Sequence, residues 1–145
     1  NILDREMGYR KAMQVAGLEK FIDVVNIDYS CIRHEISSLI PRLLESGTEA
    51  LVFSTNRLAI EALISLRQGG FVVPDDIAFI GFDGSETFAF NLYERGISYI
   101  KQPIEQFGYE AFDLLISGIS QNGGAKIVNI ELNPELVIKE SSMHK

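Results

Sequence analysis

The residue best suited to bind a ligand in this chain is Asp83, which follows the apolar run 77–82 and precedes Gly84. An apolar run between turn residues is typical of a strand covered on both faces, as in a parallel sheet with helices on each side. Ligand crevices in such sheets lie at the carboxyl ends of the strands, where a carboxylate accepts hydrogen bonds from hydroxyl groups. Asp83 could instead cap the segment that follows, since Asp often serves such ends.

Two further polar clusters come at the ends of predicted strands. Tyr29 follows the β-rich segment 21–27, and Asn56 follows the strand predicted at 49–53. Asn56 could cap the helix that begins there or present its amide to a ligand. Both clusters repeat the strand-to-helix position of Asp83, so the sequence predicts polar side chains along one edge of the sheet.

Arg5 is a candidate of a different kind, because it lies within a helix predicted over residues 4–16. A projection of that helix at 100° per residue places Arg5 on the apolar face. A guanidinium there either extends to solvent or points into a site that needs a fixed, planar donor of several hydrogen bonds.

The order of the predicted elements indicates an α/β fold with a doubly wound, largely parallel sheet. Helices are expected over 4–16, 32–46, 57–68 and from Pro103 onward, and strands over 21–27, 49–53, 77–82, 97–100, 126–132 and 136–139. Pro41 should bend the second helix, because proline removes a backbone donor. The helix after Pro103 is expected to pack through Ile104, Phe107, Ala111, Leu114 and Leu115.

The start of the chain raises a question about the sheet. A doubly wound sheet of this order places its first strand in the interior, between the second and third. Only three residues precede the predicted first helix, which is too few for a strand. We therefore expect the remaining strands to close the gap, to pair with another molecule, or to recruit residues 126–132.

Composition narrows the class of protein. The chain has 145 residues and is 46% hydrophobic, which is enough for one compact domain. A net charge of −7 disfavours direct binding to nucleic acid. A single cysteine fits a reducing compartment, and neither a membrane span nor a leader sequence is visible, so we expect a cytoplasmic protein that does not associate with a membrane.

The usual signatures of catalysis and metal binding are incomplete. Cys31 and His34 lie three residues apart but lack the third and fourth ligands that a zinc site needs. No glycine-rich phosphate loop, pair of acid and base carboxylates, or nucleophile elbow is present. We expect neither an enzyme nor a bound metal or cofactor.

One predicted helix carries apolar residues on two faces. In the helix over 57–68, Ile60 and Ile64 lie about 110 to 150° from the face that would pack on the sheet. That packing face consists of Ala59, Ala62, Leu63 and Leu66. We expect Ile60 and Ile64 to lie outside the core and to form a homodimer interface together with the helix over 32–46.

Five stretches, taken in order, carry a family resemblance. They read REMGYRKAM at 5–13, STNRLA at 54–59, VPDDIAFIGFD at 73–83, QP at 102–103 and LNPELVIKESS at 132–142. Together they resemble the carboxyl-terminal half of a LacI/GalR-type transcriptional regulator. The resemblance implies one lobe of a type I periplasmic-binding-protein-like fold over residues 1–98. It also implies a crossover segment over 99–145 that belongs partly to the other lobe.

The resemblance also implies which residues contact an effector. Arg5, Asn56 and Asp83 match polar contacts of the family, and Tyr29 matches an aromatic that packs against the ligand. Gln102 matches a position at the crossover hinge that touches ligand in some members. The implied effector is a sugar or a similarly sized polar metabolite.

The resemblance leads to a function and leaves an alternative. It implies an effector-sensing and dimerising module of a sugar-responsive regulator, which would contact DNA only through a headpiece that this chain lacks. The alternative is a lobe of a solute-binding protein that serves a transporter. One departure bears on the effector: the family usually has Asp directly after the asparagine, whereas Arg57 stands here and reverses the charge.

Overall fold

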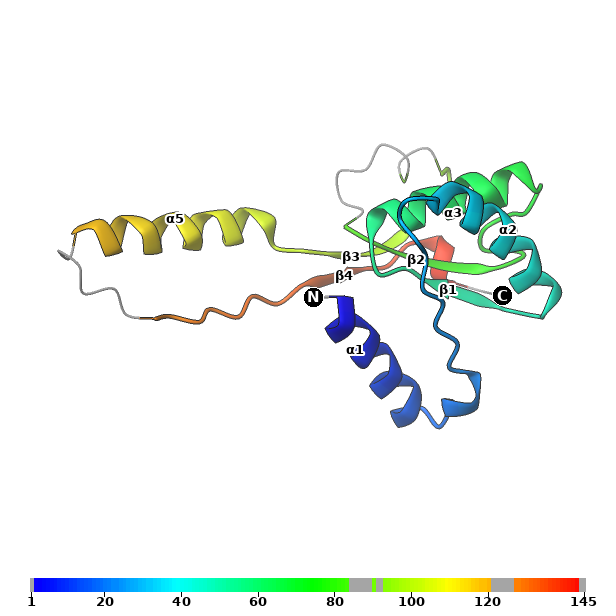
Figure 1. The fold of residues 1–145 in the computed structure, drawn as a ribbon, viewed down its shortest axis with the longest axis horizontal. Helices are drawn as coiled ribbons and strands as arrows, with labels where there is room; N and C mark the ends of the chain where they lie inside the picture. Colours follow the sequence, from blue (N-terminus) through cyan, green and yellow to red (C-terminus); the bar gives the residue numbers. More distant parts are fainter. Residues whose placement is uncertain (1, 84–89, 91–92, 121–126, 144–145) are drawn as a thin grey trace.

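A computed structural model describes residues 2–83, 90, 93–120 and 127–143 of the chain. The elements are α1 (Ile2–Val15), η1 (Glu19–Phe21), α2 (Ile32–Glu45), β1 (Ala50–Val52), α3 (Asn56–Gln68), β2 (Ala78–Phe82), β3 (Ser98–Lys101), α5 (Ile104–Ser120), β4 (Glu135–Val137) and η2 (Glu140–Ser142). Helices α2 and α3 cover one side of the sheet, α1 lies on the other side, and α5 extends away from it (Figure 1). Helix α2 continues through Pro41 without a break.

The sheet has four strands in the order β1-β2-β3-β4. Strands β1, β2 and β3 are parallel, and β4 runs antiparallel to β3. The register aligns Val52 with Ile80 and Phe82 with Ile100. The mixed α/β fold with a largely parallel sheet is confirmed, and the carboxyl ends of three parallel strands meet at one edge.

The core lies between this sheet and the helix pair α2–α3. Helix α2 buries Ile32, Ile36 and Ile40, which recur every four residues and so share one face. From the sheet side, Phe79 is fully buried, and its ring centroid lies 4.7 Å from that of Phe53. Helix α3 contributes the four residues predicted for its packing face, Ala59, Ala62, Leu63 and Leu66.

Buried hydroxyl groups attach η2 to the sheet. The Ser141 hydroxyl donates to the carbonyl oxygen of Phe79 at 2.7 Å and accepts the backbone N–H of Ser98, also at 2.7 Å. The Ser98 hydroxyl accepts the backbone N–H of Lys139 at 2.8 Å. Because a buried polar group is costly when it lacks a partner, this network holds the end of the chain against β2 and β3.

Two predicted strands are not formed. Residues 22–28 are irregular, although 21–27 has a β-rich sequence, and residues 127–132 are irregular where 126–132 was predicted. Residue 126 lies outside the described residues. A strand is stabilised by hydrogen bonds to a neighbouring strand. In a doubly wound sheet, an interior strand would lie between β1 and residues 21–27 and would pair with both. Here β1 is itself the edge of the sheet, and that interior strand is not among the described strands of the sheet. None of the described residues closes that gap.

The core face predicted for helix α5 is wrong. The five residues predicted to form its core face, Ile104, Phe107, Ala111, Leu114 and Leu115, are all exposed. Phe107 is 68% exposed and Phe112 is 65% exposed. Figure 1 shows α5 and the irregular segment 127–134 extending together away from the sheet, and we call these two segments the arm. The apolar periodicity predicts the helix and its apolar side, but no other described part of this chain covers that side.

Candidate functional site

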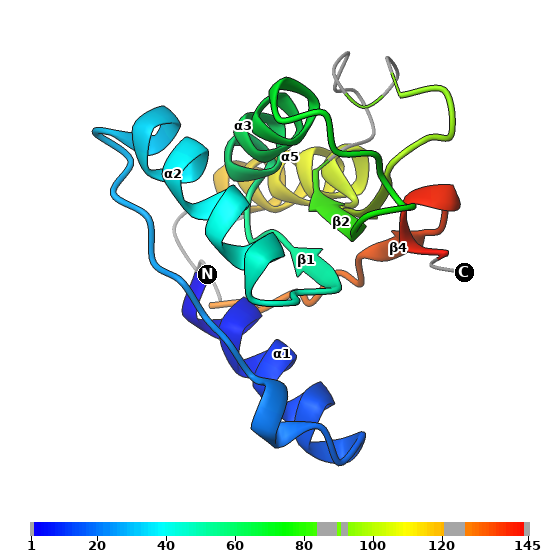
Figure 2. The ribbon, with the colours of Figure 1, turned by 90° about the vertical axis from the view of Figure 1, so that its right-hand side faces the viewer.

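Arg5 contacts two strand exits at once. Its Nη1 donates to the backbone carbonyl of Ser54, and its guanidinium carbon lies 3.7 Å from the centroid of the Phe82 ring. The register that aligns Val52 with Ile80 also brings Ser54 level with Phe82, so both contacts belong to the carboxyl edge of the sheet. Helix α1 buries no residue, and Figure 2 shows it projecting from the rest of the molecule. The Arg5 side chain therefore connects the first turn of α1 to this edge.

Asp83 and Gln102 lie together, although they are 19 residues apart. Gln102 Nε2 donates to Asp83 Oδ1 at 2.6 Å, and the backbone N–H of Asp83 donates to the carbonyl oxygen of Ile100 at 2.9 Å. Asp83 has a φ of 57°, a left-handed conformation that Asp tolerates better than most residues. The structure thus places the predicted carboxylate at the end of β2, beside the amide that follows β3.

Tyr29 is held by the start of α3. Its hydroxyl lies 2.5 Å from the Thr55 hydroxyl, and the guanidinium carbon of Arg57 lies 5.6 Å from the centroid of the ring. Thr55 is the N-cap of α3 and accepts the backbone N–H of Leu58. The capping role considered for Asn56 therefore belongs to Thr55, and Asn56 is the first residue of the helix.

Three residues make contacts at this edge that the sequence did not predict: Phe82, Thr55 and Arg57. Phe82 ends an apolar strand, so the sequence predicts that it is buried, and its ring is indeed buried beneath Arg5. Thr55 had a usable signal, since Ser and Thr directly before a helix are common N-caps. The stacking of Arg57 on Tyr29 joins residues 28 positions apart, so only the fold could reveal it.

The loop that precedes α2 has its own hydrogen bonds. Ser30 donates its backbone N–H to Asp28 Oδ1 at 2.9 Å, and this bond lowers the pKa of the Asp28 carboxyl. The Cys31 thiol donates to Glu35 Oε1 at 3.3 Å, and that bond raises the pKa of the thiol. A raised pKa reduces the thiolate fraction, so Cys31 is poorly suited to act as a nucleophile.

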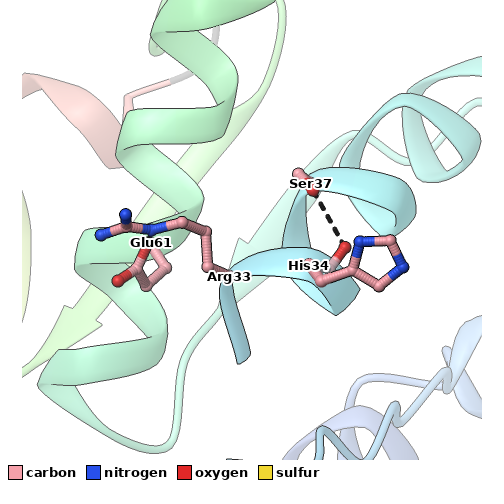
Figure 3. Close-up of polar contacts among 4 residues, drawn as sticks. All are labelled: Arg33, His34, Ser37 and Glu61. Carbon is pink, nitrogen blue, oxygen red and sulfur yellow. Dashed lines mark hydrogen bonds and ion pairs between the residues drawn. The ribbon is translucent and has the colours of Figure 1, made fainter. Parts of the chain in front are cut away.

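The face formed by α2 and α3 carries an ion pair and two shallow, open hollows. Arg33 Nε and Glu61 Oε2 lie 3.3 Å apart and bridge the two helices, while the imidazole of His34 points away from them (Figure 3). A cavity of about 590 Å³ is lined by Ser30, Cys31, Ile32, Arg33, His34, Ser37, Arg57 and Glu61. A smaller one of about 170 Å³ is lined by Arg33, Ser37, Glu61, Ile64, Ser65 and Gln68.

The two predicted interface isoleucines differ. Ile64 is 40% exposed and borders the smaller cavity. Ile60 is half-buried and packs against the hydrophobic core, so the prediction that both lie outside the core is wrong for Ile60.

Within residues 2–83, 90, 93–120 and 127–143, no three His, Cys, Asp or Glu residues come close enough to hold a metal ion. Among the helices in the described part of the chain, none is long and apolar enough to cross a membrane.

A largely parallel sheet with Arg, Asp, Gln and Tyr side chains along its carboxyl edge defines one lobe of an α/β ligand-binding fold. The family model of the periplasmic binding protein-like domain matches residues 1–142, and the chain belongs to this family. Known relatives indicate which members of this family the chain resembles in sequence: transcriptional regulators. The chain is 29% identical over 139 residues to the HTH-type transcriptional repressor PurR of Vibrio campbellii, which covers 95% of this chain and 41% of that protein.

Solved structures that are similar to this chain include transcriptional regulators as well. A LacI transcriptional regulator from a Rhodococcus species is 28% identical and superposes with a TM-score of 0.80, covering 99% of this chain and 52% of the other. The complex of the transcriptional regulator CelR with cellobiose is 26% identical with a TM-score of 0.74, covering 96% and 42%. The resemblance to LacI/GalR-type regulators is confirmed. The chain spans about two fifths of the length of the curated relative.

Proposed function

We propose that this chain is the effector-sensing and dimerising lobe of a cytoplasmic transcriptional regulator that responds to a sugar or a similar polar metabolite. The observation that carries the proposal is the carboxyl edge of the sheet. Arg5, Tyr29, Asn56, Asp83 and Gln102 reach this edge from five separate segments of the chain. Regulation of transcription fits the relatives, which are named as transcriptional regulators and not as enzymes.

The edge is suited to a hydroxyl-rich ligand. A carboxylate accepts hydrogen bonds from hydroxyl groups, a guanidinium donates to their oxygens, and an amide can do both. The Tyr29 ring offers an apolar surface to one face of a sugar. The CelR relative is described as a complex with cellobiose, which supports a saccharide as the class of ligand.

The ligand would be enclosed by a second lobe. We propose that residues 1–98 form one lobe and that part of 99–145 packs into the other. The exposed apolar residues of the arm support this division, because Phe107, Phe112 and Ile119 are each more than 60% exposed. A chain that provides one wall should bind the effector much more weakly than the complete regulator. Equal dissociation constants for the two would contradict this division.

The α2–α3 face would form the homodimer interface. Ile64 is its exposed apolar residue, and the bridged pair Arg33 and Glu61 lies beside it. In the complete regulator, Ile64→Asp should raise the dimer dissociation constant at least about tenfold, because it introduces an unpaired charge into the interface. Val15→Asp on α1 is the matched control. Sedimentation that shows the same assembly for both variants would argue against this interface.

The effector site is tested by Asp83→Asn in the complete regulator. The substitution keeps the shape and removes the charge, so binding of a hydroxyl-rich ligand should weaken by roughly 1.5 to 3 kcal/mol. Asp75→Asn is the control, since Asp75 pairs with Arg95 at the other end of β2. Calorimetry with a panel of sugars that includes cellobiose and ribose gives the readout. Equal affinities of wild type and Asp83→Asn would exclude Asp83 as a contact.

A further inference from the structure

Gln102 lies between the candidate effector site and the arm. It directly follows β3 and comes two residues before α5, which Figure 1 shows leaving the sheet at this point. The backbone carbonyl oxygen of Gln102 accepts the N–H of Ile104 at 2.9 Å, and the carbonyl oxygen of Pro103 accepts the N–H of Phe107 at 2.8 Å. The backbone of Gln102 therefore takes part in the first turn of the arm.

The side chain of Gln102 points back to the exit of β2. Its Nε2 donates to Asp83 Oδ1 at 2.6 Å, and both residues are half-buried. A hydrogen bond to a carboxylate is stronger than one between neutral groups, and partial burial shields it from water. Gln102 thus joins the predicted effector contact, through its side chain, to the first turn of α5, through its backbone.

Asp83 has a backbone conformation that its surroundings must hold. Its φ of 57° lies in the left-handed region, which costs free energy in a residue other than glycine and persists where neighbouring groups fix it. Two of its hydrogen bonds run to one segment: its N–H donates to the carbonyl oxygen of Ile100, and its carboxylate accepts from Gln102. The segment that leads from β3 into the arm therefore orients both the backbone and the carboxylate of Asp83.

The bond from Gln102 leaves the carboxylate able to bind a ligand. A carboxylate has two oxygens and about four acceptor positions, and Gln102 takes one of these on Oδ1. A ligand hydroxyl can bind without displacing Gln102. A contact residue that a second residue holds in place binds more tightly, because less freedom is lost when the ligand arrives.

We infer that Gln102 is a positioning residue, which acts on the effector through Asp83 and connects this contact to the first turn of the arm. It does not act by touching the effector, in contrast to the direct contact that the family resemblance implies. Effector binding at Asp83 and formation of the first turn of α5 stabilise each other, because both depend on the same hydrogen bond. The inference rests on the proposed function and deepens it, since it names the connection between the effector site and the arm.

The first test is a double-mutant cycle in the complete regulator, read by calorimetry with the panel that includes cellobiose and ribose. Gln102→Met keeps the length of the side chain and removes its N–H groups, so sugar binding should weaken by roughly fivefold to thirtyfold. Asp83→Gly removes the carboxylate and tolerates the left-handed backbone, so in that background Gln102→Met should change binding by less than about twofold. Gln106→Met on the exposed α5 is the matched control. An equal loss in both backgrounds would indicate direct contact, and no loss in either would indicate no role; both overturn the inference and leave the proposed function intact.

The second test uses this chain without a ligand. Gln102→Met should speed hydrogen exchange at the N–H groups of Asp83 and Ile104 by about threefold or more, as followed by NMR. The reversed pair, Asp83→Asn with Gln102→Glu, restores a hydrogen bond between an amide and a carboxylate and should return both rates to within about twofold of wild type. Unchanged exchange in Gln102→Met would overturn the inference. If no sugar binds to the wild type, sugar sensing fails; in that case, or if Asp83→Gly binds too weakly to measure, the exchange rates alone decide the inference.

Discussion

The α2–α3 layer and the arm both contain amphipathic helices, but the apolar side is buried in the first and exposed in the second. Helix α2 buries Ile32, Ile36 and Ile40 against the sheet. Helix α5 is longer and more apolar, yet Phe107 and Phe112 on it are exposed. The difference lies in whether another part of the chain covers the helix. Amphipathicity defines which side can be buried, and the topology decides whether it is buried.

The largest expected effect contrasts one aromatic residue from each region. Phe79→Ala should lower the free energy of unfolding by about 3 to 5 kcal/mol, because Phe79 is fully buried and stacks near Phe53. Phe112→Ala on the exposed arm should change it by about 0.5 kcal/mol or less. Urea unfolding of this chain followed by circular dichroism measures both. Similar losses would mean that α5 is packed in solution, and the contrast between the two regions would disappear.

A smaller effect is expected where the arm returns to the sheet. Ser141→Ala should lower the free energy of unfolding by about 1 to 3 kcal/mol, since it leaves the Phe79 carbonyl and the Ser98 N–H without their partner. Ser38→Ala is the control, because its hydroxyl lies on the exposed side of α2 and bonds only the His34 carbonyl. The same urea measurement applies. A neutral Ser141→Ala would show that the network does not hold η2 in place.

A local effect is expected at α1. Arg5→Ala removes the contacts with Ser54 and Phe82, so the amides of α1 should exchange with solvent faster, by roughly fivefold or more. The amides of α2 should not change. Hydrogen exchange read by mass spectrometry compares this variant with Arg10→Ala, which removes only an ion pair within α1. Equal exchange in the two variants would mean that Arg5 does not connect α1 to the sheet.

The smallest effect concerns pH at the loop before α2. The Ser30 N–H lowers the pKa of Asp28 below 3.8, so the folded state binds this proton less readily than the unfolded state. The resulting stabilisation is present above pH 3.8 and is lost as the pH falls through the folded-state pKa. Wild type and Asp28→Asn should therefore differ slightly at pH 7 and converge near the acid limit. A difference that persists in acid would assign the effect to something other than this charge.

Much of the candidate site could be predicted because strand exits are readable in the sequence. Asp83 follows an apolar run and Asn56 follows another, and parallel strands bring such exits to one edge. The pairing of Asp83 with Gln102 and the stacking of Arg57 on Tyr29 could not be predicted from spacing. Each joins segments that are distant along the chain, so each depends on the register of the sheet and on the position of a helix start.

The sequence by itself determined the local elements, which are the helices, the apolar strands β1 to β3 and the turn residues between them, because these follow from side-chain periodicity and backbone preference. Only the tertiary structure decided which apolar faces are buried. The β-rich segment 21–27 forms no strand, and the apolar side of α5 stays exposed. A strand requires a hydrogen-bonded neighbour and an apolar face requires a packing partner, and neither requirement is written in the segment itself.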